Sequence, residues 1–122
     1  MVQKGALFLG TNPDNNMKMK DFKMPAAGCM IHSIALAAEK QPHFIGKPNP
    51  DVINIACETF GLDLKECLIV GDSLATDITL GKNAGIDSFL VLSGVTSEEK
   101  VKSETEKVEG IVPNYYWDQL EV

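Results

Sequence analysis

The stretch that decides the fold is Cys67-Leu68-Ile69-Val70-Gly71-Asp72-Ser73-Leu74-Ala75-Thr76-Asp77. Its apolar run predicts a buried strand, and the glycine that follows predicts a turn. Asp72 then lies at the carboxyl end of the strand, where open α/β sheets place their ligands. Asp77 follows on the turn or on the first residues of a helix. Such carboxylates suit Mg²⁺, which proteins commonly hold with one or two carboxylates and a substrate phosphate.

A lysine held between a glycine and a proline precedes this stretch, in Ile45-Gly46-Lys47-Pro48-Asn49-Pro50. A fixed ammonium group near a carboxylate-held metal can neutralise the charge of a transferring phosphoryl group. We therefore expect Lys47, Asp72 and Asp77 to share one site. The residues leave two alternatives open, namely an exposed lysine in a proline-rich turn and a pair of acids that cap a helix.

Composition indicates an ordinary soluble globular protein of one modest domain. The chain has 122 residues, is 44% hydrophobic and 23% charged, and carries a net charge of −6. Because no basic stripe occurs, we expect no nucleic-acid partner. We expect no membrane partner, because no apolar run reaches the ~20 residues that a span needs. The first five residues lack the apolar region of a secretory signal, so we expect a cytoplasmic protein.

Hydrophobic patterning predicts strands that alternate with helices. Helices between successive strands imply right-handed βαβ units and a parallel sheet whose strands are buried on both faces. The expected strands are 5–10, 43–45, 67–70, 88–92 and a short one around 111–112, before a terminal turn with Tyr115, Tyr116 and Trp117. The expected helices run from Pro25 towards Pro42, from Pro50 to Phe60 and from about Asp77 to Ala84. Residues 17–24 show no clear period, so we expect irregular structure there.

The helix that follows Lys47 has the clearest boundaries. Asn49 can cap it and Gly61 can end it in a left-handed conformation. Its expected buried face consists of Ile53, Ala56, Cys57 and Phe60. We expect Cys29, Cys57 and Cys67 to be buried reduced thiols, since their spacing suits no metal. The glutamate-rich segment 97–109 is expected to be a solvated surface helix or loop.

Several of these motifs together resemble the haloacid dehalogenase (HAD) superfamily, and within it the branch of 4-nitrophenylphosphatases, phosphoglycolate phosphatases and NagD-like proteins. The resemblance rests on Ile45–Pro50, on Leu68–Ile78, on Gly81 and Ala84-Gly85, and on Leu92-Ser93-Gly94-Val95-Thr96. Thr11-Asn12-Pro13-Asp14, Pro25-Ala26-Ala27-Gly28 and Val112-Pro113-Asn114-Tyr115-Tyr116 match the same branch. Nearly the whole chain is covered, in order and at the expected spacing.

The resemblance implies a Rossmann-like α/β core with a parallel sheet, of which residues 44–122 form the C-terminal half. Residues 1–43 would be the tail of a C2-type cap. It implies a Mg²⁺-dependent phosphomonoester hydrolase in which Lys47 and Asp77 are catalytic and Asp72 binds the metal. Asn12 and Asp14 would contact a small phosphorylated metabolite from the cap, although a turn stabilised by Asx hydrogen bonds explains this pair equally well.

Members of the superfamily attack phosphate with an aspartate of an N-terminal Asp-x-Asp motif. No such motif precedes Lys47, so we expect this chain to contain no nucleophile, to correspond to the C-terminal part of such an enzyme and to be inactive alone. The alternative function is a non-catalytic remnant that forms a homodimer or pairs with the missing N-terminal half. An exposed apolar strand edge would favour such pairing.

Overall fold

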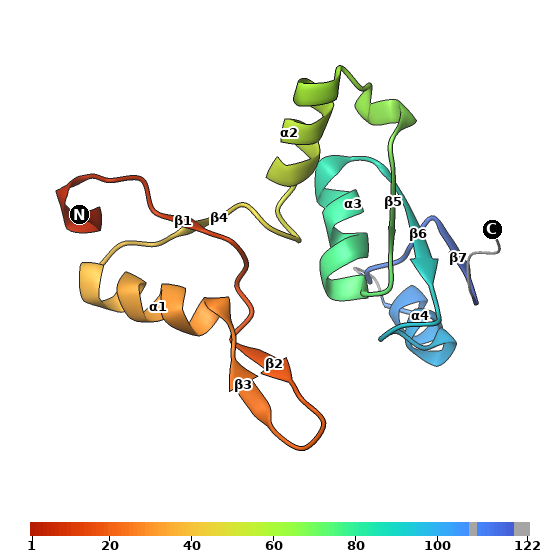
Figure 1. Cartoon of the computed structure of the whole chain (residues 1–122). Coiled ribbons are helices and arrows are strands. Elements are labelled where there is room, and N and C mark those ends of the chain that lie inside the picture. Colours follow the sequence, from red (N-terminus) through yellow and green to blue (C-terminus); the bar gives the residue numbers. More distant parts are fainter. Residues whose placement is uncertain (108–109, 119–122) are drawn as a thin grey trace. The chain divides into compact units, whose positions relative to one another are not determined.

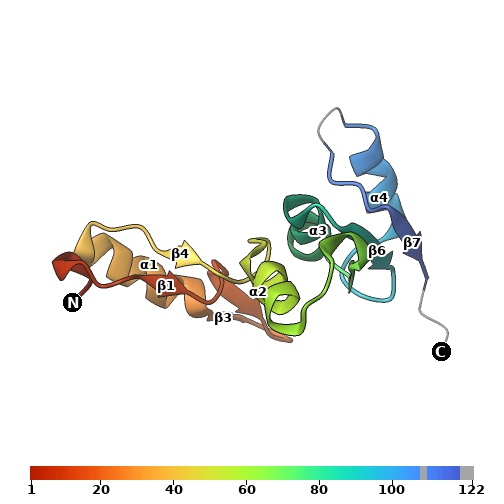
Figure 2. The ribbon, with the colours of Figure 1, turned by 90° about the horizontal axis from the view of Figure 1, so that it is seen from above.

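The computed structural model describes residues 1–107 and 110–118. The chain divides into two compact units, Met1–Gly46 and Lys47–Val122, which we call the first and second units. The division falls after Gly46, and the assignment of residues 1–43 to a cap and of 44–122 to a core half stays a prediction. Figures 1 and 2 show the elements of both units from two directions.

The first unit combines one long helix with two small sheets. A short 3₁₀ turn η1 (Val2–Lys4) precedes β1 (Leu9–Gly10), which pairs in parallel with β4 (His43–Phe44). Helix α1 (Ala27–Ala38) lies between these strands in the sequence and buries Gly28 and Ala35. The predicted strand at 43–45 and the helix after Pro25 are therefore confirmed, whereas the strand expected over 5–10 is reduced to its last two residues.

Residues 16–25 are not irregular, contrary to our expectation. They form an antiparallel hairpin of β2 (Asn16–Lys18) and β3 (Lys23–Pro25), in which Met17 faces Met24. The amide of Met19 donates to the carbonyl of Phe22 across the turn, at 2.8 Å. All six strand residues are exposed, so the hairpin has no alternating burial pattern. Hydrophobic periodicity therefore could not predict these strands.

The second unit is built on a three-stranded parallel sheet in the order β5-β6-β7. Its elements in chain order are α2 (Asp51–Phe60), η2 (Leu64–Glu66), β5 (Leu68–Gly71), η3 (Leu74–Ile78), α3 (Thr79–Ala84), β6 (Asp87–Val91), α4 (Glu98–Thr105) and β7 (Tyr115–Trp117). The predicted parallel α/β arrangement is confirmed. Figure 1 shows α3 beside β5, and β6 between β5 and β7.

One face of this sheet carries the core. Leu90 of β6 is completely buried against Leu74 and Ile78 of η3 and Val101 of α4, with Leu92 and Ile111 at the margin of the cluster. A glutamate-rich segment that we expected to be wholly solvated therefore supplies a core residue. Ser97 caps the start of helix α4, where its side chain accepts a hydrogen bond from the amide of Lys100 at 3.3 Å.

The opposite face of the sheet is open in the described part of the chain, so our expectation of strands buried on both faces is wrong here. Burial alternates along β5, and Leu68 and Val70 are 50% and 43% exposed. Tyr115 and Trp117 of β7, which pair with Phe89 and Val91, are also exposed. Both faces of a parallel sheet are normally covered, and the described residues do not cover this one.

The last strand lies four residues later than we expected. Ile111 and Val112 form no strand, and Tyr115–Trp117, expected to be a turn, pair with β6 instead. The cause is a side-chain contact, because Asn114 Oδ1 accepts hydrogen bonds from the amide and hydroxyl of Ser88 at 3.0 and 2.9 Å. This contact sets Tyr115 beside Phe89, and three consecutive aromatic residues suit the pleated strand that follows.

The predicted boundaries of helix α2 are confirmed, but most of its predicted buried face is exposed or only half-buried. Asn49 Oδ1 accepts from the amide of Asp51 at 3.0 Å, and Gly61 ends the helix with φ of 66°. Only Cys57 of the expected face is buried, and Phe60 is exposed because no described element packs over it. Of the three cysteines, Cys57 is buried, Cys67 is half-buried and Cys29 is exposed, which corrects our expectation for Cys29.

Within the described residues, no helix combines the length and the apolar character that crossing a membrane would need.

Candidate active site

Asp77 is the centre of the site at the carboxyl end of β5. It is buried on a wide turn, η3, in which the amides of Asp77 and Ile78 both donate to the carbonyl of Ser73, at 2.9 and 3.1 Å. Such π-type turns occur often at functional sites. The turn brings Asp77 back over the end of β5, where a Cβ atom on Gly71 would lie 2.3 Å from the Asp77 side chain. Only glycine fits at position 71.

The two oxygens of the Asp77 carboxylate have different partners. Oδ2 accepts hydrogen bonds from the amides of Asp72 and Ser73, at 3.2 and 3.1 Å. Oδ1 lies 2.6 Å from Nζ of Lys47. The Asp77 side chain is 5% exposed and the Lys47 side chain is 52% exposed. A buried carboxylate thus holds one side of an ammonium group whose other side is accessible to solvent.

Lys47 is positioned by the turn that leads into α2. The carbonyl of Pro48, the next residue, accepts a hydrogen bond from Asn83 Nδ2 of α3 at 2.8 Å. The start of this turn is therefore attached to the helix that follows Asp77. These contacts confirm that Lys47 and Asp77 lie together, as we expected from the sequence.

Asp72 is held by the loop after β6. Its Oδ2 accepts a hydrogen bond from the amide of Val95 at 3.1 Å. A Cβ atom on Gly94 would lie 2.0 Å from the same oxygen, so the loop can approach the carboxylate this closely only with glycine at position 94. The carboxyl ends of the neighbouring strands β5 and β6 thus meet at Asp72, as expected for a ligand site in a parallel sheet.

The donor set of this site fits a partial magnesium site. Both oxygens of Asp77 are engaged by Lys47 and by backbone amides, whereas Oδ1 of Asp72 has no hydrogen-bond partner among residues 1–107 and 110–118. No group of three or more acidic, histidine or cysteine side chains that could hold a metal occurs in those residues. Because Mg²⁺ often binds one or two carboxylates and otherwise water and phosphate, Asp72 suits one position of its shell.

The sequence did not indicate the roles of Val95 and Asn83. Gly94 and Val95 stood out only as a part of the family resemblance, directly after a predicted strand. The contact of the Val95 amide with Asp72 could have been inferred from Gly94, because this glycine follows a strand that neighbours the strand leading to Asp72. The bond from Asn83 to Pro48 has no such signal.

Asn12 and Asp14, the expected substrate contacts, belong to the first unit. Asn12 Oδ1 accepts a hydrogen bond from the amide of Asp14 at 3.0 Å, which is the Asx turn that we gave as the alternative. The carbonyl of Asp14 accepts from the amide of Gly28 at 2.8 Å and so connects this turn to α1. The turn has a structural function, and substrate contact from these residues remains a prediction.

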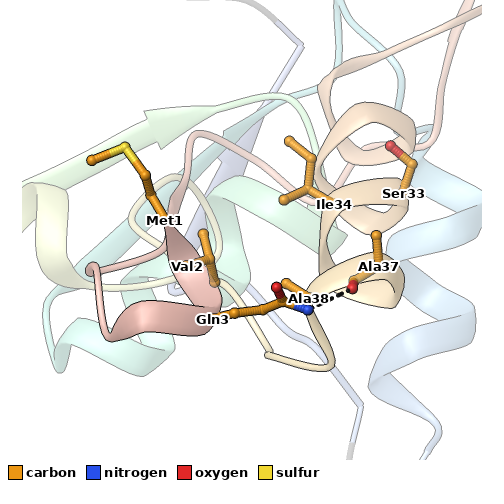
Figure 3. Close-up of a pocket in the computed structure, with 7 residues that line it drawn as sticks. All are labelled: Met1, Val2, Gln3, Ser33, Ile34, Ala37 and Ala38. Carbon is orange, nitrogen blue, oxygen red and sulfur yellow. Dashed lines mark hydrogen bonds between the residues drawn. The ribbon is translucent and has the colours of Figure 1, made fainter.

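The first unit also contains a hollow of about 430 Å³ between η1 and α1. Figure 3 shows its lining, which consists of Met1, Val2, Gln3, Ser33, Ile34, Ala37 and Ala38. Gln3 Nε2 donates to the carbonyl of Ala37 at 3.3 Å, and the Ser33 hydroxyl is engaged by the carbonyl of Met30 at 2.7 Å. No acidic or basic side chain lines this hollow.

Comparison with known proteins identifies the family. The family model described as HAD-hydrolase-like matches residues 44–119. This chain belongs to the HAD-like hydrolase family. Its fold is also that of the family, since it resembles a p-nitrophenyl phosphatase from Archaeoglobus fulgidus with a TM-score of 0.83 and 30% identity, over 97% of this chain and 45% of that one. NagD from Escherichia coli K-12 gives a TM-score of 0.79 at 34% identity, over 97% and 44% of the two chains.

Curated HAD-like relatives are named as phosphatases. Phosphoglycolate phosphatase 2 of Arabidopsis thaliana is 39% identical over 92% of this chain and 36% of its own length. Glycerol-3-phosphate phosphatase of Gallus gallus is 33% identical over 93% of this chain and 38% of its own length. The chain therefore spans less than two fifths of these two relatives, and the part matched in the solved structures is their C-terminal part. The resemblance seen in the motifs is confirmed.

Proposed function

We propose that this HAD-like chain supplies the lysine and the metal-binding acid of a Mg²⁺-dependent phosphomonoester hydrolase. The observation that carries the proposal is the Asp77 carboxylate, which accepts from Lys47 with one oxygen and from the turn that presents Asp72 with the other. This contact sets a cation and a free carboxylate oxygen at one end of a parallel sheet. A phosphoryl group needs both kinds of group around it.

Each side chain has a distinct task in this proposal. Lys47 is fixed by Asp77 and half exposed, so its remaining N–H groups can donate hydrogen bonds to oxygens of a phosphoryl group. Asp77 keeps the ammonium in place and is a positioning residue. Asp72 offers one oxygen to the metal, while the Val95 amide orients its carboxylate through the other. Mg²⁺, when bound, would neutralise charge that develops on the phosphoryl oxygens.

The covalent step requires a nucleophile from outside these residues. The sequence contains no Asp-x-Asp motif, which in the family supplies the attacking carboxylate. We therefore propose that the chain alone has no specific turnover, and that its site is completed by an N-terminal half in the same or another chain. The substrate class is a small phosphorylated metabolite, in keeping with the phosphoglycolate and glycerol-3-phosphate phosphatases among the relatives.

The test is hydrolysis of p-nitrophenyl phosphate with Mg²⁺. The 122-residue chain alone should give no rate above EDTA and Asp72→Asn controls. A chimera that joins the chain to the N-terminal part of the Archaeoglobus fulgidus p-nitrophenyl phosphatase should hydrolyse p-nitrophenyl phosphate. In that chimera, Lys47→Ala and Asp72→Asn should each reduce kcat by a factor of 100 or more, and Asp87→Asn on the exposed surface should not. An active chimera that tolerates Lys47→Ala would contradict the proposal.

A second function, self-association, is favoured by the open face of the sheet. Strand β5 is an edge strand in the described residues, and the exposed side chains of Leu68, Val70, Tyr115 and Trp117 share its uncovered face. Exposed edges and apolar patches of this kind recruit partners. We propose a homodimer through this face as the alternative. Sedimentation velocity should then show a dimer that grows with concentration and that Val70→Lys abolishes, whereas a monomer at every concentration would exclude it.

A further inference from the structure

Two of the three cysteines lie in contact although they are ten residues apart in the sequence. Sγ of Cys57, in the last turn of α2, is 3.6 Å from Sγ of Cys67, directly before β5. A disulfide bond needs about 2.05 Å between the sulfurs, so the two sulfur atoms must approach by about 1.5 Å to form one. The contact is independent of the Lys47, Asp72 and Asp77 site, and the proposed hydrolase mechanism does not use it.

The two thiols differ in access. Cys57 is buried at 8% exposure, whereas Cys67 is half-buried. Burial, and to a lesser extent the neighbouring Cys67 thiol, raise the pKa of Cys57 above its usual value. The Cys67 thiol donates to the carbonyl of Asp63 at 3.3 Å and is the one that a solvent-borne oxidant can reach. Cys67 therefore has the features of the thiol that an oxidant attacks first, and Cys57 those of the thiol that resolves the product into a disulfide.

We propose that Cys57 and Cys67 form a reversible intramolecular disulfide when the protein meets a peroxide, and are thus a redox modification site. Cys67 Sγ attacks one peroxide oxygen, the O–O bond breaks, and the leaving hydroxide takes up the thiol proton as water. Cys57 Sγ then attacks the sulfur of the resulting Cys67 sulfenic acid, the S–O bond breaks, and the Cys57 proton leaves in a second water. The two thiols give up two electrons and the peroxide accepts them.

The disulfide would cross-link helix α2, which follows Lys47, to the start of β5, which leads to Asp72. Cys57 lies on the helix that begins four residues after Lys47, and Cys67 lies immediately before the strand that ends next to Asp72. The closed loop spans η2 and restricts the unfolded chain, so the oxidised protein should unfold at a higher temperature than the reduced protein. A thiol reductant such as dithiothreitol should reverse this shift.

The experiment uses the full chain carrying Cys29→Ser, because Cys29 is exposed and would react on its own. Reduced protein, denatured and treated with N-ethylmaleimide, should take up two labels, and protein oxidised with hydrogen peroxide should take up none. Trypsin cleaves after Lys65, between the two cysteines, so peptides 41–65 and 66–82 should appear as one linked mass that separates on reduction. Two retained labels, a Cys67 sulfinic acid or a link only between two chains would overturn the proposal.

Two further variants distinguish the attacking from the resolving thiol. In Cys29→Ser/Cys57→Ser, oxidation should stop at a Cys67 sulfenic acid that dimedone traps. In Cys29→Ser/Cys67→Ser, the buried Cys57 should remain largely available to N-ethylmaleimide after the same exposure and denaturation. The opposite pattern, with dimedone trapped at Cys57, would show that the assigned order of attack is wrong.

Discussion

One oxygen of the Asp77 carboxylate lies 2.6 Å from Nζ of Lys47, while the other accepts the amides of Asp72 and Ser73. The buried side chain of Asp77 thus joins the end of β5 to Lys47, which lies thirty positions before Asp77 in the sequence. Lys47 and Asp72 come from separate segments, and Asp77 is the group through which both are positioned. The consequences can be tested without any enzymatic activity.

Asp77→Asn should destabilise the second unit. Asparagine can still accept one set of bonds with its carbonyl oxygen, but its NH₂ group would face either Lys47 or the two amides. Leaving such buried groups unsatisfied costs about 1–3 kcal/mol. Urea unfolding followed by Trp117, the only tryptophan, should show this loss. Asp87→Asn, on the exposed surface of β6, is the matched control and should leave the midpoint nearly unchanged.

Gly94→Ala should destabilise the protein through its clash with Asp72, because a Cβ atom would lie 2.0 Å from Asp72 Oδ2. The loss is expected to be about 1–3 kcal/mol, as for overpacking elsewhere. The same Cβ atom would lie 2.3 Å from Asp72 Cβ, which alanine would keep, so only an Asp72→Gly background removes the clash, and there the substitution should cost less. Equal losses in the two backgrounds would show that Gly94 is needed for the loop backbone alone.

Asn114→Ala should release β7 from β6. Ser88 is buried, and its amide and hydroxyl would both lose their acceptor, at a cost of about 1–3 kcal/mol. Trp117 lies three positions further on, so its fluorescence should change in the folded state as well as at unfolding. Asn114→Asp keeps the acceptor oxygen and should recover most of the stability. If both variants unfold like the parent chain, the contact does not hold the strand.

Glu104 should make stability depend on acid pH. Hydrogen bonds from Lys107 and Lys100 lower the pKa of this carboxyl from 4.5 to about 2. Since the folded protein binds the proton less readily than the unfolded chain, the stabilisation is present above about pH 4.5 and is lost as pH falls towards 2.

The measurement compares thermal unfolding of the parent and of Glu104→Gln across this range. At pH 7 the variant should unfold at a lower temperature, and the difference should shrink steadily below pH 4.5. Glu106→Gln, two positions along the same segment and exposed, is the control and should show no such convergence. A difference between parent and Glu104→Gln that stays constant with pH would assign the effect to packing.

Much of the candidate site could be predicted because its signals are local. The apolar run before Gly71, the acids that follow it and the glycine–lysine–proline turn each depend on neighbours in the sequence, and the structure brings Lys47 and Asp77 into contact as expected. The same holds for Gly61, whose left-handed conformation ends α2, and for the parallel pairing of β5 with β6. The resemblance to the HAD superfamily rests on these local motifs as well.

The features that the sequence predictions missed depend mainly on contacts between residues that are distant in the sequence. The last strand is Tyr115–Trp117 because Asn114 bonds to Ser88, twenty-six positions away, and no local propensity at Ile111 could show this. The β2–β3 hairpin escaped notice because its exposed residues leave no periodic pattern. The loop amide on Asp72 and the contact between Cys57 and Cys67 likewise appear only when separate segments are brought together.

The sequence by itself determined the α/β class, the order of its main strands and helices, and the identity of the charged residues at the site. Hydrophobic period, turn residues and motif spacing act over a few positions, and these are visible in a single chain. Tertiary structure alone decided which carboxylate oxygen remains free, which face of the sheet stays open and which thiols meet. Those properties depend on distances between side chains that the sequence order leaves undefined.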